Sequence, residues 1–288
     1  MTLAIEAVAC QNRLGEGPFW DRRDQVLYWV DINSARLFSL HPESGQMDFA
    51  QLPLTVTAMG AREAGGLVVA TRSGLGYYDP LDRRLETVLS VLPDDDEGRF
   101  NDGRVDPLGR FWAGTYNKNR HPTSKLYRFD PDLTVHTMER HLVNSNGIDW
   151  SPDHRTMYHT HTTELTIYAY DFDPSTGETE NRRAFIQVPE TPGEGRPDGL
   201  TVDSEGFLWS ARYGGGKIVR YDPEGKFVQE IHLPVRNVTS CEFGGQELNT
   251  LFITTAWSGP AYEPGSQEGN LFFVQTAVSG LPKPSFQG

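Results

Sequence analysis

The sequence is poor in cysteine and in long apolar segments. Only Cys10 and Cys241 occur among the 288 residues, which excludes a disulfide framework, and their spacing is not that of a metal site. No apolar run approaches the roughly 18 residues of a transmembrane helix. The N-terminus lacks a positively charged start and carries Glu6 within its apolar run, so it is a poor signal peptide. We therefore expect a cytoplasmic protein.

Positively charged residues are also fewer than negatively charged ones. Lys and Arg total 26 against 39 Asp and Glu, which gives a formal net charge of −13. Nucleic acids and anionic membranes carry negative charge themselves, so neither is expected as a partner. We expect a small molecule instead, and the sequence does not indicate an oligomeric state.

Helical periodicity and the common catalytic motifs are absent too. The sequence has no Gly-x-Ser-x-Gly motif, no phosphate-binding loop, no dinucleotide fingerprint and no zinc-binding helix motif. Short segments instead alternate apolar and polar residues between Gly, Pro and Asp, as at residues 26–31 and 217–223. This pattern predicts an all-β protein.

A short phrase recurs six times, starting near residues 15, 58, 101, 146, 198 and 240. In four of the six a polar side chain stands next to glycine, and the phrases are 42 to 52 residues apart. Repeats of this length that are rich in short strands are typical of propeller blades. We predict a single six-bladed β-propeller domain over residues 1–288.

The two ends of the chain have no place in the first five blades. Residues 4–10 read as a strand, and we expect them to supply the outer strand of the sixth blade, which closes the ring and removes an open sheet edge. The last eight residues, 281–288, are expected to be loosely ordered.

Matching positions of successive blades meet around the propeller axis. We therefore expect Glu16, Asn101, Asp102, Asn146 and Asp198 to converge there. Two carboxylates that point at one axis repel each other unless a cation or a proton lies between them. Glu16, Asn146 and Asp198 offer the oxygen ligands that hard divalent cations prefer. Asn-Gly and Asp-Gly are also common turn dipeptides, but their shared phase in several blades favours one divalent ion, Ca²⁺, Mg²⁺, Mn²⁺ or Zn²⁺.

Other polar residues near these positions have more than one interpretation. Asn101 is either a fourth metal ligand or a substrate contact. Arg99 offers a rigid fork of donors for the oxygens of a ligand, or it pairs on the surface with the acidic residues 94–97. His159 and His161 alternate with threonines and face the same side of a strand, as a second metal site, a catalytic base or merely polar strand residues.

The motifs at residues 15–18, 99–110, 145–150, 197–199 and 239–245 resemble the regucalcin (senescence marker protein)/gluconolactonase/luciferin-regenerating enzyme-like family, in order and over essentially the whole chain. The resemblance implies a six-bladed propeller with one channel metal and hydrolysis of aldonolactones. It implies metal ligands at Glu16, Asn146 and Asp198, with Asp198 as the catalytic acid/base. Arg99 and Asn101 match its substrate contacts, and we add Asp102 and His161 as candidate contacts.

Two features depart from the family pattern. The loop at residues 117–121 has no carboxylate, and His161 stands where an aspartate is usual. Both changes fall where a substrate would be held. We predict metal-dependent hydrolysis of a sugar lactone such as glucono-, xylono- or arabinonolactone. The alternatives are a phosphotriesterase-like metal-dependent hydrolase and a non-enzymatic calcium-binding propeller.

Overall fold

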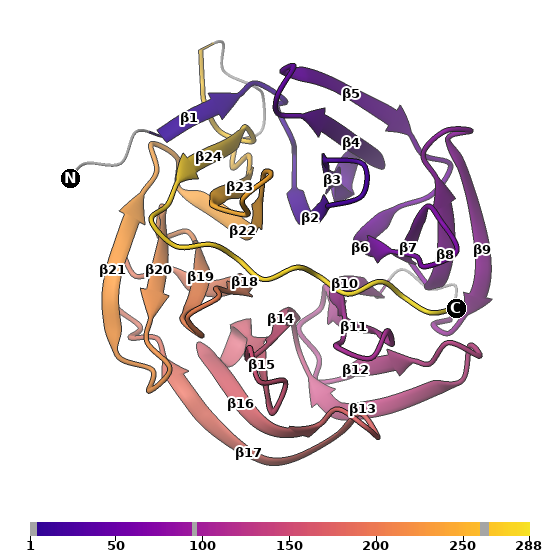
Figure 1. Ribbon diagram of the computed structural model, residues 1–288. Helices are drawn as coiled ribbons and strands as arrows, with labels where there is room; N and C mark the ends of the chain where they lie inside the picture. The colour runs from indigo at the N-terminus through magenta and orange to yellow at the C-terminus, as the bar shows by residue number, and fades with distance from the viewer. Residues whose placement is uncertain (1–4, 94–96, 260–264) are drawn as a thin grey trace.

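A computed structural model describes residues 5–93, 97–259 and 265–288. Its strands form six four-stranded antiparallel sheets arranged in a ring (Figure 1). The prediction of an all-β, six-bladed propeller is therefore confirmed. Helical structure among the described residues consists of two short 3-10 turns, Ile32–Ser34 and Thr162–Glu164. In this part of the chain no helix has the length and apolarity needed to cross a bilayer.

In each of the first five blades the chain runs from the channel outwards. Blade 1 contains β2 (Gly15–Asp21), β3 (Val26–Asp31), β4 (Arg36–His41) and β5 (Gln46–Gln51), and blade 2 contains β6 (Val56–Ala61), β7 (Leu67–Thr71), β8 (Gly74–Asp79) and β9 (Arg84–Ser90). Blade 3 contains β10 (Gly98–Val105), β11 (Phe111–Asn117), β12 (Ser124–Phe129) and β13 (Val135–Leu142). Blade 4 contains β14 (Ser145–Trp150), β15 (Thr156–His161), β16 (Thr166–Asp173) and β17 (Glu178–Gln187), and blade 5 contains β18 (Arg196–Val202), β19 (Leu208–Tyr213), β20 (Lys217–Tyr221) and β21 (Phe227–His232).

The sixth blade joins the two ends of the chain. It contains β22 (Asn237–Gly244), β23 (Thr250–Ala256) and β24 (Leu271–Gln275), and β1 (Ile5–Val8) pairs with β24 as the outer strand. The predicted closure by the N-terminal segment is confirmed, although the strand is shorter than residues 4–10, and residue 4 lies outside the described residues. This pairing closes the ring, as Figure 1 shows.

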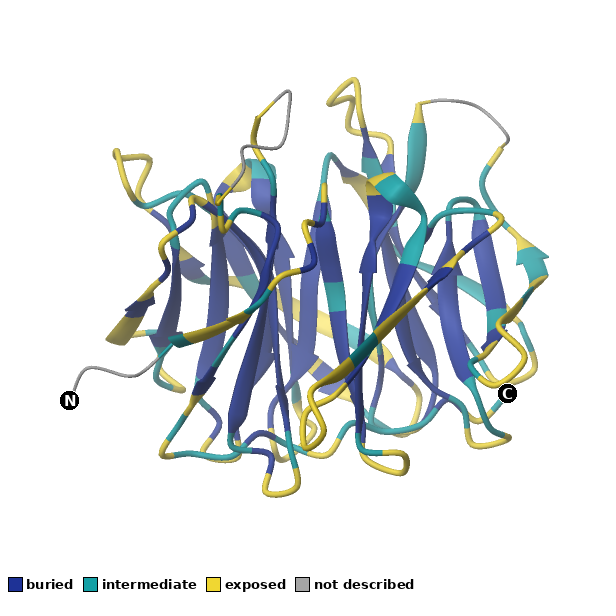
Figure 2. Ribbon diagram, turned by 90° about the horizontal axis from the view of Figure 1, so that it is seen from above, coloured by how far each residue is buried: buried dark blue, intermediate teal, exposed yellow. Residues whose placement is uncertain are grey.

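The hydrophobic core lies between neighbouring blades. Every residue of β3 is buried, because this second strand of its blade is covered on both faces, whereas the outer strands β5 and β9 expose four of six and four of seven residues. Figure 2 shows the buried strands in dark blue between exposed loops in yellow. Aromatic rings join adjacent blades: Trp112 of blade 3 packs edge-on against Trp150 and Phe172 of blade 4. The ring is thus held together by side-chain packing between blades.

The C-terminal segment crosses one end of the ring, as the yellow chain in Figure 1 shows. Phe286 is fully buried in the core cluster between blades 2 and 3, and its backbone pairs with Arg62. Lys283 reaches into the channel and donates a hydrogen bond to Asp149 at 2.6 Å. The prediction that residues 281–288 are loosely ordered is therefore wrong, because a buried ring and a buried cation anchor the segment.

This anchoring can be measured with a single substitution. Phe286→Ala removes a fully buried ring, and a Phe-to-Ala change in a core costs about 3–5 kcal/mol. We expect a clear drop in the midpoint of chemical denaturation. Gln287→Ala alters an exposed side chain of the same segment and should leave the midpoint unchanged. Equal midpoints for the two variants would show that the segment does not contribute to stability.

Candidate active site in the propeller channel

A β-bulge in the innermost strand of each blade positions the channel residues. The register shifts between Glu16 and Phe19 in β2, between Phe100 and Gly103 in β10, between Ser145 and Ile148 in β14, and between Pro197 and Leu200 in β18. Equivalent shifts occur in β6 and β22. The repeated phrase of the sequence is therefore a bulge, which re-aims a side chain out of the regular ladder.

Five of the predicted residues line a common cavity of about 440 Å³. They are Glu16, Arg99, Asn101, Asn146 and Asp198. The volume falls within the range of about 300–1,000 Å³ that small-molecule sites occupy. The remaining lining residues are Leu14, Asn33, Tyr116, Arg120, Val143, Asn144, Thr162, Thr163, Arg196 and Tyr213.

Among the described residues, no counter-charge is in direct contact with the two carboxylates of this cavity. Burial raises the pKa of Glu16 well above its usual value, and the negative charge of Asp198 raises it further. Burial also raises the pKa of Asp198, with Asp102 adding to the effect and Arg99 opposing it. Buried Oδ1 of Asp198 has no hydrogen-bond partner among the described residues, and Oε2 of Glu16 accepts only the amide of Gly17 at 3.3 Å.

This arrangement fits a divalent cation. Buried carboxylate oxygens without partners are costly unless a cation or a proton compensates them. Oxygen donors from Glu16, Asp198 and the amide carbonyl of Asn146 are ligands that Ca²⁺, Mg²⁺ and Mn²⁺ accept.

A chain of hydrogen bonds holds the Asn146 side chain. Its Nδ2 donates to Thr162 Oγ1 at 2.9 Å, and that hydroxyl donates to the Pro197 carbonyl at 2.8 Å. Asn101 Nδ2 donates to Asn146 Oδ1 at 2.9 Å and to the Ser145 carbonyl at 2.9 Å. Thr162 was not predicted from the sequence. Its position directly after His161, at the end of β15, could have indicated that it lies near the channel.

Arg99 lies in the same cavity. Its Nη1 donates to Asn101 Oδ1 at 2.6 Å and to the Phe100 carbonyl at 2.8 Å, and its guanidinium carbon lies 5.2 Å from the Tyr116 ring centroid. Its other nitrogens have no hydrogen-bond partner among the described residues. Of the acidic run considered as its surface partner, residues 94–96 lie outside the described residues. The position of Arg99 in the cavity favours the ligand-binding interpretation.

Asp102 does not join this group. It lines a separate small cavity with Arg104, Glu242 and Lys283, toward the end of the channel that the C-terminal segment covers. Its Oδ1 accepts the Gly103 amide at 2.7 Å. Adjacent residues of a strand direct their side chains differently, which explains why Asn101 and Asp102 face different cavities. The expected substrate contact through Asp102 therefore does not fit the structure.

His161 does not line the cavity either. Its ring packs edge-on against Tyr168, with centroids 4.6 Å apart, and its Nε2 lies 3.3 Å from Glu139 Oε2 of blade 3. His159 lies on the same side of β15, as expected, and the two rings face the interface between blades 3 and 4. The structure therefore does not bring His161 to the cavity that contains the other predicted substrate contacts.

Comparisons with known proteins identify the family of this chain. Residues 14–257 match the model of the SMP-30/Gluconolactonase/LRE-like region. The chain belongs to this family. It is 41% identical over 244 residues to a 6-deoxy-6-sulfogluconolactonase of Pseudomonas putida, which covers 84% of this chain and 83% of the relative. It is 40% identical over 245 residues to a pentonolactonase of Haloferax volcanii, which covers 85% and 82% respectively.

This chain is also similar to a solved structure of a calcium-binding protein, regucalcin from Agrobacterium tumefaciens. The match covers 100% of this chain and 98% of that structure. The TM-score is 0.93 at 26% sequence identity. The family resemblance seen in the sequence is thus confirmed over the whole propeller.

The unpaired carboxylates lead to a stability prediction. In a chelating buffer, Asp198→Asn removes a buried charge with an unsatisfied oxygen, and such a group costs about 1–3 kcal/mol. We expect this variant to melt at a higher temperature than the metal-free wild type.

Asp149→Asn is the matched control on a neighbouring inner strand. Asp149 is equally buried, but it is paired with Lys283 at 2.6 Å and Arg104 at 3.5 Å. Breaking a buried ion pair costs about 3–5 kcal/mol, so this variant should melt at a lower temperature. Destabilisation of both variants to the same extent would contradict the proposed difference between the two aspartates.

Proposed function

We propose that the protein is a metal-dependent hydrolase that opens a sugar lactone to the corresponding sugar acid. The observation that carries this proposal is the pair of buried carboxylates, Glu16 and Asp198, beside an amide oxygen and an arginine in one cavity. The family membership and the lactonase names of two relatives at 40–41% identity support it.

Glu16, Asn146 and Asp198 would hold the metal ion. The hydrogen bonds from Thr162 and Asn101 fix the Asn146 amide, so its oxygen is held in place beside the two carboxylates. A divalent cation bound here supplies a Lewis acid that polarises the lactone carbonyl.

The chain itself supplies the proton transfer. Asp198 Oδ1 has no hydrogen-bond partner among the described residues, so this oxygen can accept a proton as a general base. Asp198 accepts a proton from the attacking water as the water oxygen bonds to the carbonyl carbon. When the bond from that carbon to the ring oxygen breaks, the proton passes to the ring oxygen and yields the hydroxy acid.

Arg99 and Asn101 position the substrate in this scheme. The Arg99 nitrogens that do not donate to Asn101 or Phe100 can donate to the oxygens of a bound lactone. Negative charge develops on these oxygens during attack. The bond between Arg99 and Asn101 holds the fork in a single orientation, so the donors need little reorganisation.

The cation requirement and the substrate can be tested together. We expect hydrolysis of a panel of sugar lactones to stop after chelation and to return with Ca²⁺, Mg²⁺, Mn²⁺ or Zn²⁺. Asp198→Asn should lower kcat at least 100-fold, since general base catalysis contributes about 10²–10⁴-fold. Asp171→Asn changes an exposed aspartate and serves as the control.

Other outcomes point to the alternatives. Turnover of an organophosphate but no lactone would favour a phosphotriesterase-like hydrolase. Metal binding without turnover of either class would favour a calcium-binding propeller. Full lactone turnover in chelator would contradict metal dependence.

The mouth of the cavity suggests which lactones bind. Arg120 and Arg196 line it together with Arg99, although the protein carries a net charge of −13. Arg196 has one distant partner, Glu190 at 3.9 Å, and Arg120 lies in the loop where the family carboxylate is missing. We propose that this cationic rim holds a lactone with an anionic substituent. The sulfonated substrate in the name of the Pseudomonas relative supports this choice.

This preference predicts a change in substrate ranking. The ratio of kcat/KM for 6-phosphogluconolactone to that for gluconolactone should fall about tenfold in Arg120→Gln combined with Arg196→Gln, because hydrogen bonds to charged groups contribute about 1.5–3 kcal/mol. Activity on the neutral lactone should change little. Arg84→Gln, on outer strand β9, is the control. A constant ratio in the double variant would exclude a role for the rim in selectivity.

A further inference from the structure

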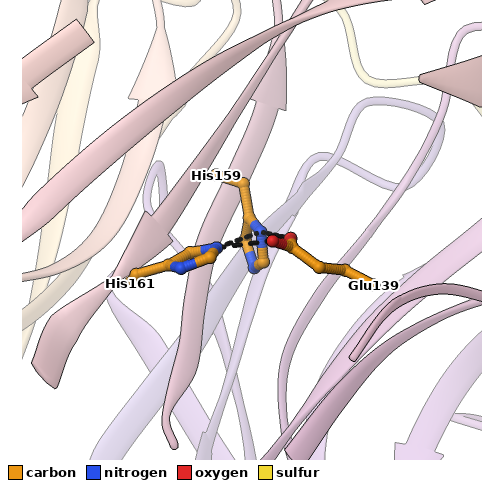
Figure 3. Close-up of side chains that lie close together, drawn as sticks. All are labelled: Glu139, His159 and His161. Carbon is orange, nitrogen blue, oxygen red and sulfur yellow. Dashed lines mark hydrogen bonds and ion pairs between the residues drawn. The ribbon is translucent and has the colours of Figure 1, made fainter. Parts of the chain in front are cut away.

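A second group of ligand-type side chains lies outside the channel. Glu139 is on β13 of blade 3, and His159 and His161 are on β15 of blade 4. Figure 3 shows the three side chains pointing toward one another across the blade interface. The group is buried, with exposed side-chain fractions of 13% for Glu139, 0% for His159 and 3% for His161.

The spacing of the three facing atoms matches a tetrahedral site. Glu139 Oε2 lies 3.4 Å from His159 Nδ1 and 3.3 Å from His161 Nε2, and the two nitrogens are 3.2 Å apart. An ion with tetrahedral bonds of about 2.0–2.1 Å places its ligand atoms about 3.3 Å apart. The three edges therefore have the length that one zinc-like ion requires.

Neighbouring groups orient each of these ligands. Ser145 Oγ lies 2.7 Å from His159 Nε2, and Glu164 Oε1 lies 3.4 Å from His161 Nδ1, so each ring has a partner on its outward nitrogen. The Tyr170 hydroxyl donates to Glu139 Oε2 at 2.8 Å. Such partners on the outer side of ligands are a regular feature of histidine metal sites.

A cation also pairs with the Glu139 oxygen that faces away from the two histidines. Arg182 neutralises the other oxygen, Oε1, at 3.0 Å. Neutral imidazole and ionised carboxylate are the forms that bind metal.

We propose that Glu139, His159 and His161 bind one Zn²⁺-type transition-metal ion that links blades 3 and 4. Imidazole nitrogens favour Zn²⁺ and similar ions, whereas the oxygen ligands of the channel favour Ca²⁺ or Mg²⁺. The two sites therefore differ in selectivity. This inference does not rest on the proposed lactonase activity, because it uses none of the channel residues.

Co²⁺ reports on this site directly, because tetrahedral Co²⁺ absorbs strongly in the visible range. The full-length protein is titrated with Co²⁺ in excess Ca²⁺, which occupies the channel. We expect one equivalent of bound Co²⁺ with a tetrahedral spectrum, displaced by Zn²⁺ and not by more Ca²⁺. Asp198→Asn, which alters only the channel, should give the same spectrum.

Variants of the cluster complete the test. Glu139→Gln preserves the side-chain shape and should weaken Co²⁺ binding at least 100-fold, and Ser145→Ala should weaken it about 10- to 100-fold through His159. His136→Gln changes a half-buried histidine on the same strand as Glu139, so it is the matched control and should bind as the wild type does. Circular dichroism confirms that each variant is folded before titration.

Two results would contradict a metal site at Glu139, His159 and His161. Absence of a tetrahedral Co²⁺ spectrum in the wild type would overturn the proposal, as would unchanged affinity in a folded Glu139→Gln variant. The cluster would then be a hydrogen-bonded group in which Glu139 Oε2 accepts from both histidines and Tyr170. If Glu139→Gln fails to fold, the spectrum of the wild type with its displacement by Zn²⁺ and the Ser145→Ala affinity decide the question.

Discussion

The channel depends on how closely the inner strands approach one another at their bulges. A side chain at Gly147 would place its Cβ 2.5 Å from the backbone nitrogen of Leu200, and one at Gly199 would lie 2.1 Å from Ser240 Oγ. Each glycine thus lets the next blade pack against the bulge. Without this approach the ligand-bearing residues of neighbouring blades, Asn146 and Asp198, could not share one cavity. Glycine is required here for space between blades.

The two ends of the channel differ in how their buried carboxylates are compensated. At the end covered by the C-terminal segment, Asp149 and Glu242 are compensated by Arg104 and Lys283. These buried ion pairs close the channel and serve structure. At the other cavity, no cation of the described part of the chain contacts Glu16 or Asp198, and burial raises both pKa values. A binding site and a structural network therefore lie on the same strands and differ in whether the protein supplies the counter-charge.

The repeat in the sequence predicts the positions of some channel residues and not of others. Glu16, Asn146 and Asp198 lie at the bulges of the innermost strands of blades 1, 4 and 5, so the repeat indicated that they line one cavity. Asp102 and His161 could not be placed in this way. Asp102 lies one residue after Asn101 in its bulge and faces another cavity, and the His161 ring on the second strand of blade 4 faces blade 3. Phe286 was misjudged because a single aromatic in a Pro-rich tail gives no periodic signal, although it is fully buried.

The sequence by itself determined the all-β class, the six blades, the closure by the N-terminal strand and the oxygen-rich set of channel residues. Each of these follows from local patterns that recur at regular intervals along the chain. Residues at equivalent positions of the blades lie close together because the blades surround one axis. Tertiary structure alone decided which groups are paired. The meeting of Glu139 with His159 and His161, and of Lys283 with Asp149, joins residues of unrelated phase across blade interfaces. Such contacts depend on side-chain direction and burial, which no short segment specifies.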